Sequence, residues 1–538
     1  MRTIKGVELR DNMCPSDESF VKFATDYIKD IARTGVELIM FDDDLRYGFL
    51  ENSPACLCDG HIKAINEITG DNLSREEIEK HISTGGPNKY RDAYLSANGN
   101  SFRSFCSAVR SAVDEVSADI RIGACACLTS WDIDGTDAYE LAKILAGCTR
   151  PFVRLIGAPY WAYNRTWGNL LQDVVELERM EACWTRNGDI EIMAEGDVFP
   201  RPRTTCPASY LEGFDTAIRA SGSTDGILKY GIDYHSNADY ETTYAKYHEI
   251  NRGLYSEIDS MFSGKASCGV RVYESMKKAS ATVCSTAVND YTNLENEFFS
   301  KAARTLAFNT IPTVYEGDGV CGIVFDENAR SLPLEPLKNG LIIDLAAAEI
   351  LTERGIDVGL VEIGKQISVN TERFIKNNNH IYSRGGVMNE IKVKENAKVL
   401  SVLESSSGDI PFSYCYENTS GNRFLVLNIN TRIGSDNLLK HYERNRQYCE
   451  VAEWLGGKKL PATVYGHPSL YIQCKKGEDG SLAVGLWNFF EDTAFEPVVK
   501  LDGNFSKIKF ANCNGSLSGS EVHLSDIPPF SCAVFEVK

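Results

Sequence analysis

Two acidic segments of the sequence have the residue types and positions that acid–base chemistry needs. Glu195 directly follows the apolar run Ile190–Ala194, so its carboxylate would be held rigidly at the end of a buried strand. The second segment, Asp42–Asp44, follows another short strand pattern at Glu37–Phe41. Cleavage of a glycosidic bond needs one carboxyl group that protonates the leaving oxygen and a second that attacks the anomeric carbon or activates water. The two segments therefore indicate glycosidase chemistry, provided that the fold brings them together.

Each acidic segment also has an ordinary explanation. Glu195 could be a strand-end acid that caps the next turn, and Asp42–Asp44 could be a solvated turn. The triple carboxylate could instead bind Ca²⁺ or Mg²⁺, which prefer oxygen ligands, and would then belong to a metal-dependent hydrolase. Neighbouring carboxylates raise one another's pKa toward the range that a general acid needs, but the same crowding would serve a metal ion, so the run alone does not decide between these interpretations.

Aromatic and charged residues follow the same predicted strands. They would offer sugar-stacking faces and hydrogen-bonding groups, although core packing is the alternative for each aromatic ring. Two guanidinium groups, Arg201 and Arg203, could bind substrate hydroxyls or hold the acids ionised, and salt bridges to helices are the alternative. The candidate substrate-binding residues are Asp43, Trp131, Tyr160, Trp161, Arg201, Asp233 and Tyr234, with Phe199 as a further aromatic face.

Potential metal ligands are clustered at Cys56, Cys58 and His61, and Cys14 lies upstream as a possible fourth. Thiolates and an imidazole at this spacing suit Zn²⁺ in tetrahedral coordination. A site closed by four protein ligands would be structural, because no open position remains for substrate. Buried cysteines without a metal are the alternative.

The residues that could do chemistry lie on an alternation of strand and helix patterns. The apolar runs are Glu37–Phe41, Ile120–Ala124, Phe152–Ile156, Ile190–Ala194 and Gly226–Tyr230. Amphipathic stretches separate them, which predicts a parallel sheet with helical crossovers. Polar or aromatic residues follow all five runs, as in a (β/α)8 barrel whose strand ends share one cleft, whereas an open doubly wound sheet uses only those near its switch point. We therefore predict a barrel catalytic domain over residues 1–262.

The remainder of the chain changes character twice. Residues 263–356 combine strand and helix patterns and predict a small α/β domain. Over residues 357–538, strand patterns such as Arg423–Ile429 and Ser481–Trp487 alternate with turns rich in Gly, Asn and Ser, which predicts an all-β region.

Composition disfavours several classes of partner. The chain has 538 residues and a formal net charge of −19, so its surface should repel nucleic-acid phosphates and anionic lipid. It contains no run of about 18 uncharged apolar residues, and Met1–Arg10 lacks the apolar core of a secretion signal. The 17 cysteines, scattered through a large acidic chain, are typical of reduced thiols, and we expect a cytoplasmic location.

The order of these features resembles glycoside hydrolase family 42 and related retaining glycosidases with a (β/α)8 fold. In that family a Cys-Pro-Asn-Ser-Pro segment precedes a helix and a strand that ends in Asp-Asn-Glu, and a Cys-x-Cys-x2-Cys cluster follows. Here Cys14-Pro15-Ser16, Asp42–Asp44 and the cluster from Cys56 to His61 occur in the same order.

The resemblance implies that Glu195 is the nucleophile, Asp44 the acid/base and Asp43 a sugar-binding position. It also implies a flavodoxin-like middle domain that forms a homotrimer, followed by a C-terminal β-domain. The implied ligands of a structural zinc ion are Cys14, Cys56, Cys58 and His61.

The sequence departs from the family pattern at several points. Asp44 is one methylene shorter than the family's Glu, Asp43 replaces an amide, and His61 replaces a cysteine, which zinc tolerates. If Glu37–Phe41 is the fourth barrel strand, the later runs are the fifth to eighth, and Met1–Met13 is too short to form the first three. We therefore expect a truncated chain or a mis-assigned start, with free sheet edges; the alternative is a different strand count.

The sequence as a whole predicts a retaining β-glycosidase acting on β-linked oligosaccharides, related to β-galactosidases. It would use a two-carboxylate double displacement and no catalytic cofactor. The alternative is a non-catalytic carbohydrate-binding or assembly protein on a degenerate barrel, which the missing strands and the Asp at the acid position favour.

Overall fold

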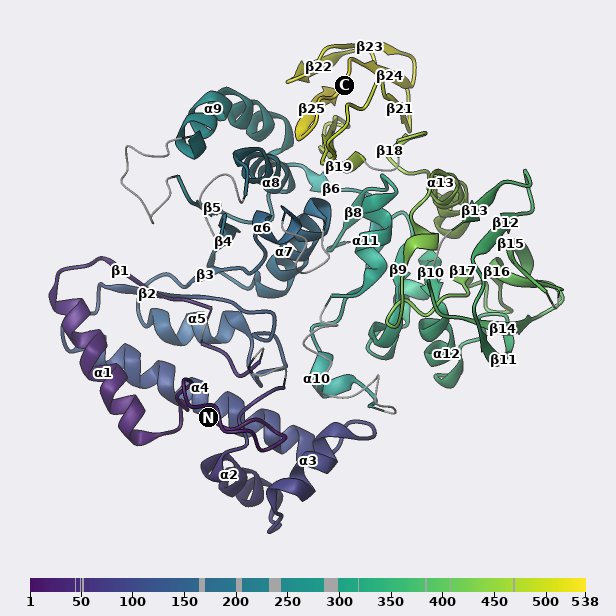
Figure 1. The fold of residues 1–538 in the computed structure, drawn as a ribbon. Coiled ribbons are helices and arrows are strands. Elements are labelled where there is room, and N and C mark those ends of the chain that lie inside the picture. Colours follow the sequence, from purple (N-terminus) through teal and green to yellow (C-terminus); the bar gives the residue numbers. More distant parts are fainter. Residues whose placement is uncertain are drawn as a thin grey trace.

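The computed structural model of the chain contains three sheet-bearing regions (Figure 1), which follow one another along the sequence except that one short strand, Ala266–Ser267, joins the third region from a position before the second. The residues that the structure describes are 1–43, 45–48, 50, 53–163, 170–199, 206–231, 243–284, 299–317, 319–382, 385–406, 408–467 and 470–538. Within these ranges, no helix combines the length and the apolar character needed to cross a bilayer.

The first region contains a five-stranded parallel sheet, here called the N-terminal sheet. Its strands lie in the order β1-β2-β3-β4-β5, and every neighbouring pair is parallel. Their bounds are β1 Leu38–Phe41, β2 Arg121–Cys125, β3 Phe152–Arg154, β4 Glu191–Gly196 and β5 Gly226–Lys229. All five apolar runs of the sequence form strands of this sheet, and β1 and β5 are its two edges.

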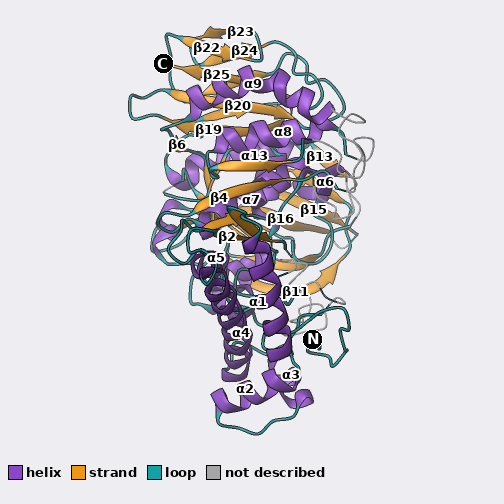
Figure 2. Cartoon of the chain, turned by 90° about the vertical axis from the view of Figure 1, so that its left-hand side faces the viewer, coloured by secondary structure: helices purple, strands orange, loops and turns teal. Residues whose placement is uncertain are grey.

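Helices connect these strands where the sequence shows amphipathic stretches. In α4, Phe102, Phe105, Val109 and Val113 recur at helical spacing and are buried. This helix packs against α1, α2 and α5, and Figure 2 shows α1 and α4 side by side, at the end of the molecule opposite the C-terminal strands. The helices are α1 Glu18–Arg33, α2 Asp59–Thr69, α3 Arg75–Ser83, α4 Lys89–Asp114, α5 Ala138–Ala146, α6 Pro159–Tyr163, α7 Leu171–Thr185, α8 Ala208–Ser221 and α9 Thr243–Phe262.

The second region is built on a nine-stranded mixed sheet, the middle sheet, with the order β13-β12-β15-β16-β17-β10-β9-β7-β8. The strands from β17 to β8 pair in parallel, and the others pair antiparallel. The strand bounds are β7 Val270–Val272, β8 Thr313–Val314, β9 Gly322–Val324, β10 Leu341–Asp344, β12 Thr371–Phe374, β13 His380–Tyr382, β15 Lys398–Ser405, β16 Gly408–Glu417 and β17 Arg423–Leu427.

Strand β17 lies within the stretch that the sequence predicts as all-β, yet it pairs in parallel with β10. The middle sheet therefore joins strands from both sides of residue 356. Helices and a two-stranded ribbon accompany this sheet: α10 Lys278–Ala281, α11 Lys301–Phe308, α12 Leu345–Glu353, α13 Tyr442–Gly456, β11 Leu360–Ile367 and β14 Met388–Val393.

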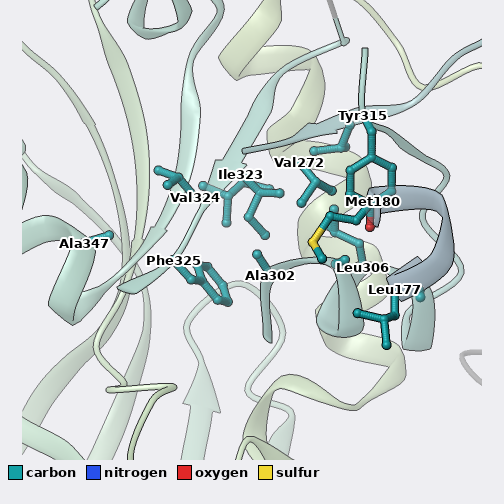
Figure 3. Close-up of a cluster of buried hydrophobic side chains, with 14 of the residues drawn as sticks. Leu177, Met180, Val272, Ala302, Leu306, Tyr315, Ile323, Val324, Phe325 and Ala347 are labelled. Atoms are coloured by element: carbon teal, nitrogen blue, oxygen red, sulfur yellow. The ribbon is translucent and has the colours of Figure 1, made fainter. Parts of the chain in front are cut away.

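Helix α7 connects the N-terminal sheet to the middle sheet through buried contacts. Leu177 and Met180 of α7 lie in one apolar cluster with Val272, Leu306 and Tyr315 (Figure 3). Glu176 of the same helix accepts hydrogen bonds from the hydroxyl group of Tyr315, next to the middle sheet, at 2.8 Å, and from that of Tyr471, in the C-terminal part of the chain, at 2.6 Å. Because α7 is held on both sides, the side chains that it presents to the N-terminal sheet are fixed in place.

The third region consists of two antiparallel sheets, the C-terminal sheets, with the orders β18-β21-β24-β23 and β22-β25-β20-β19-β6. An apolar core of mostly aliphatic side chains lies between them. The strand bounds are β6 Ala266–Ser267, β18 Ala462–Val464, β19 Leu470–Lys476, β20 Leu482–Asn488, β21 Val498–Leu501, β22 Ile508–Ala511, β23 Gly515–Ser518, β24 Glu521–Leu524 and β25 Ser531–Val537.

Candidate active site and metal centre

Glu195 lies near the carboxyl end of β4, a strand with neighbours on both sides in the N-terminal sheet. The residue is 4% exposed. Its Oε2 accepts a hydrogen bond from the N–H of Gly157 at 2.9 Å, and its Oε1 lies 3.1 Å from Nη1 of Arg154. Burial raises the pKa of Glu195 to about 7, although Arg154 and the Gly157 N–H both favour the ionised form.

Arg154 of β3 joins the two acidic segments, and the sequence analysis missed it. While Nη1 contacts Glu195, Nη2 lies 3.8 Å from Oδ1 of Asp42, just after β1. The ends of β1 and β4, far apart in the chain, therefore meet around one cation. A signal for Arg154 is present in the run Phe152–Ile156, because an arginine inside an apolar strand that a sheet buries needs an anionic partner.

Of the other two acids that follow β1, the structure describes Asp43 only. Asp44 lies outside the described residues. Asp43 forms an ion pair of 2.8 Å with Arg46, and its charge contributes to the raised pKa of Glu195. Asp42 and Asp43 thus lie on the same side of the sheet as Glu195, as a shared cleft requires.

Two buried acids of α7, also missed by the sequence analysis, hold the backbone around Glu195. The N–H of Glu195 donates to Oε1 of Glu178 at 2.8 Å, and the N–H of Ile156 donates to Oε2 of Glu181 at 3.1 Å. Burial raises the pKa of both carboxyl groups well above the ordinary range. Glu178 thus positions the Glu195 backbone, and Glu181 supplies an acceptor just past the end of β3.

The aromatic candidates divide into two groups. Tyr160 of α6 lies edge-on to Phe199, with ring centroids 5.7 Å apart, and the charge of Glu195 adds to burial in raising the pKa of the Tyr160 hydroxyl. Trp161 and Trp131 are buried in the core, and the Trp131 N–H donates to Thr185 at 3.2 Å. Tyr160 and Phe199 therefore flank the Glu195 region, whereas the two tryptophans pack as core residues. The other candidates, Arg201, Arg203, Asp233 and Tyr234, lie outside the described residues.

The four predicted metal ligands, by contrast, are brought together completely. The ligand atoms of Cys14, Cys56, Cys58 and His61 all lie within 4.8 Å of one another. Cys14 Sγ is 3.9 Å from Cys58 Sγ and 3.7 Å from His61 Nδ1, and Cys58 Sγ is 3.3 Å from that nitrogen. A zinc tetrahedron with bonds of about 2.3 Å to sulfur and 2.0 Å to nitrogen has edges of about 3.5–3.8 Å. The donor set and spacing therefore fit a structural metal such as zinc.

The surroundings of this cluster also suit metal ligands. Cys14 precedes α1, and Cys58 is the N-cap of α2, where the helix dipole favours a thiolate. Hydrogen bonding to Cys56 lowers the pKa of Cys14. Nε2 of His61 faces away from the sulfurs, 3.4 Å from the Ser101 hydroxyl and 3.5 Å from that of Tyr47, which leaves Nδ1 for a metal. A bound ion would tie the starts of α1 and α2 together.

Several β-galactosidases of known structure share this architecture. The β-galactosidase from Bacillus circulans sp. alkalophilus matches with a TM-score of 0.59 at 12% identity, over 99% of this chain and 84% of its own. A GH42 β-galactosidase from G. stearothermophilus gives 0.58 at 12% identity, over 100% and 84%. The enzyme from the Antarctic haloarchaeon Halorubrum lacusprofundi gives 0.60 at 13% identity, over 100% and 86%.

The chain has the fold of the GH42 β-galactosidases. This match confirms the resemblance to GH42 that the cysteine and aspartate segments indicate. No protein-family model and no curated protein matches the sequence. The overall architecture of these enzymes is therefore preserved here, with five parallel strands in the N-terminal sheet of the described residues, at an identity too low to carry the activity with it.

Proposed function

We propose that the chain is a retaining β-glycosidase in which Glu195 is the nucleophile and Asp44 the acid/base. The supporting observation is that the acidic end of β1 and Glu195 of β4 meet at Arg154, at 3.8 and 3.1 Å. A nucleophile must be anionic, and a guanidinium at this distance favours the anion in a site where burial disfavours it. Asp44 comes two residues after Asp42, on the same segment.

The proposed reaction has two steps. A carboxylate oxygen of Glu195 attacks the anomeric carbon while Asp44 gives its proton to the leaving oxygen, so the glycosidic bond breaks and an ester to Glu195 forms. Asp44 then takes a proton from water, whose oxygen attacks the anomeric carbon and releases Glu195 as a carboxylate. The substrate class is β-linked galactosides or related β-glycosides, as the names of the structurally similar enzymes suggest, with Tyr160 and Phe199 available to stack on sugar rings.

We also propose that Cys14, Cys56, Cys58 and His61 hold a structural zinc ion. The residues supply three sulfurs and one nitrogen at tetrahedral spacing. All four positions would be filled by protein, so the ion would stabilise the starts of α1 and α2 and take no part in the reaction.

A panel of nitrophenyl glycosides tests the enzyme. The chain should hydrolyse a β-glycoside, with retention of the anomeric configuration seen by NMR, and Glu195→Gln should abolish turnover. Glu191→Gln is the matched control, since Glu191 lies on the same strand but pairs with Arg121 at 2.6 Å. Inversion of configuration, or full activity of Glu195→Gln, would refute the proposal.

A second candidate, a non-catalytic carbohydrate-binding protein, is favoured by one observation. Glu195 is 4% exposed, and both of its carboxylate oxygens are engaged, by Gly157 and by Arg154. Sugar binding without turnover, unchanged by Glu195→Gln, would support this candidate.

A further inference from the structure

Arg271, in the parallel part of the middle sheet, is a cation with no anionic partner among the described residues. Its Nε and Nη1 are buried without a hydrogen-bond partner, and its guanidinium group forms no ion pair with a residue that the structure describes. A guanidinium group that is partly removed from water loses hydration, and an anion normally compensates for that loss.

Other arginines of the chain show how this compensation usually occurs. Three of them also have a buried Nε without a hydrogen-bond partner, yet each forms an ion pair, of 2.6, 3.1 and 2.5 Å respectively: Arg121 with Glu191, Arg154 with Glu195 and Arg444 with Glu372. Among these four arginines, Arg271 alone has a charge that no described residue compensates.

Arg271 lines a pocket of about 200 Å³ at the carboxyl end of β7. Tyr273, which directly follows β7, contributes to the wall of this pocket, together with Trp184 in the last turn of α7 and Tyr315 just after β8. The guanidinium group of Arg271 lies 5.5 Å from the centroid of the Tyr273 ring. The pocket therefore combines one cation with aromatic walls.

The order of the strands makes this end of β7 a topological switch point. β8 follows β7 along the chain and pairs on one side of it, whereas β9, the next strand in the chain, pairs on the other side. The crevice between such strands, outside their carboxyl ends, is where open parallel sheets bind ligands. The pocket has walls from both strands, because Tyr273 and Ser275 follow β7, and Asn328 and Ser331 follow β9.

The other charged residue of the pocket wall does not compensate Arg271. The side chain of Glu274 is fully buried, and its carboxylate lies 2.5 Å from Nζ of Lys278. This carboxylate also accepts hydrogen bonds from Asn328 at 2.9 Å and from the Ser300 hydroxyl at 2.5 Å. The negative charge of Glu274 is therefore already balanced by groups other than Arg271.

We propose that this pocket, here called the Arg271 pocket, binds the oxyanion group of a small molecule, either a phosphate or a carboxylate. A guanidinium group matches the geometry of both. The hydroxyl of Ser275 accepts a hydrogen bond from the N–H of Lys277 at 3.1 Å, so its own hydrogen can be donated to an oxyanion. The proposal does not depend on Glu195 being a nucleophile.

The size of the Arg271 pocket limits the ligand. A water molecule occupies about 30 Å³ in the liquid, so 200 Å³ corresponds to roughly six or seven waters. This volume suits a molecule of the size of a sugar phosphate or a uronic acid, and it excludes a polymer. The rings of Trp184 and Tyr273 would contact the apolar part of such a molecule.

Calorimetric titration of the 538-residue chain tests the proposal. The probes are inorganic phosphate, glucose 6-phosphate and glucuronate, with glucose as the neutral control, all in Tris chloride at constant ionic strength. At least one of the three oxyanions should bind. Hydrogen exchange then locates the site, because the bound oxyanion should slow exchange in peptides that cover residues 271–275 and 328–333, whereas glucose should leave them unchanged.

Substitution of the cation sharpens the test. Arg271→Gln removes the charge and should weaken oxyanion binding at least about tenfold. Arg150→Gln is the matched control, because Arg150 forms its ion pair with Asp189, at 2.9 Å, away from the pocket wall, and this variant should bind as the unsubstituted chain does. If Arg271→Gln does not fold, the exchange pattern of the unsubstituted chain decides.

The probes also distinguish the two sources of the oxyanion. Binding of the two phosphate compounds alone assigns the Arg271 pocket to phosphates, and binding of glucuronate alone assigns it to carboxylates; both results support the proposal. It is overturned if no oxyanion binds up to about 10 mM, if Arg271→Gln binds as tightly as the unsubstituted chain, or if the slowed peptides lie elsewhere. A smaller oligomer of Arg271→Gln in sedimentation, without anion binding by the unsubstituted chain, would assign Arg271 to a second copy and overturn the proposal as well.

Discussion

The edge strands of the N-terminal sheet and of the C-terminal sheets differ in length and in polarity. Among the C-terminal edge strands, β6 has two residues, β23 carries Ser516 and Ser518, and β22 carries Lys509. The edge strand β1 of the N-terminal sheet is Leu-Ile-Met-Phe. Short or polar edges discourage pairing with another chain, and apolar edges promote it. The comparison indicates that, among these described edge strands, β1 is better suited to pair with further polypeptide than β6, β22 or β23.

The two regions also differ in what they bury. The N-terminal region buries the carboxyl groups of Asp134, Glu178, Glu181 and Glu195, and burial raises the pKa of each. The core between the C-terminal sheets consists of apolar side chains. Buried acids with perturbed pKa values destabilise a fold and are common at functional sites. Of these two regions, the N-terminal one is therefore expected to carry the chemistry and the larger cost in stability.

The largest difference should appear in catalysis. Glu195→Gln removes the attacking carboxylate and should lower kcat/KM for the best nitrophenyl β-glycoside by at least about a thousandfold. Glu521→Gln on β24 of the C-terminal region should leave it unchanged. Equal effects of the two substitutions would contradict the assignment of chemistry to the N-terminal sheet.

The second difference concerns the cysteines. Cys58→Ser should reduce bound zinc and lower the free energy of unfolding by several kcal/mol, because metal binding contributes directly to folding. Cys474→Ala in β19 removes a buried thiol of the C-terminal region and should cost about 1–2 kcal/mol without changing zinc content. Metal analysis and denaturant unfolding measure both. Protein purified without chelator that contains no zinc would exclude the site.

A smaller effect is expected at Glu178. Glu178→Leu removes the acceptor for the Glu195 N–H and should lower kcat by about tenfold with little change in KM, because the nucleophile is displaced but sugar contacts remain. Glu178→Gln keeps a carbonyl acceptor and should restore most of the rate. If the leucine and glutamine variants lose the same activity, the hydrogen bond does not position Glu195.

The smallest effect is on stability against pH. Burial raises the pKa of Glu195 and of Asp134 to about 7, from ordinary values of 4.5 and 3.8. Between these values the folded chain holds protons that the unfolded chain has lost, so the free energy of unfolding falls as pH rises toward 7. Asp134→Asn should flatten this decline, seen in urea unfolding at pH 5 and 7.

Asp479 in the C-terminal region is the control for this measurement, because the fold lowers its pKa, whereas burial raises that of Asp134. The hydrogen bonds that its carboxylate accepts from Ser481 lower its pKa to about 2. Asp479→Asn should therefore leave the change between pH 5 and 7 as it is in the unsubstituted chain. If Asp134→Asn also leaves the fall in the free energy of unfolding between pH 5 and 7 unchanged, the Asp134 carboxyl group is not the cause of that fall.

Much of the framework could be predicted from the sequence. The five strand runs and the Cys14–His61 ligand set follow from local patterns, because strand periodicity and ligand spacing are properties of short segments. Glu178 and Glu181 could not be found this way, since acids on a helix normally face solvent and only the packing of α7 buries them. The parallel pairing of β17 with β10 was missed for a related reason: alternation marks a strand but does not identify its partner.

The central claim is that Glu195 forms a covalent bond to the sugar, and trapping that ester tests it most directly. A 2-deoxy-2-fluoro-β-galactoside with a dinitrophenyl leaving group should label the chain, because fluorine slows release of the ester by destabilising its oxocarbenium-like transition state. Mass analysis of a digest should find one added sugar, on the peptide that contains Glu195, and none in Glu195→Gln. A label on a different peptide, or an active enzyme that takes up no label, would contradict the account.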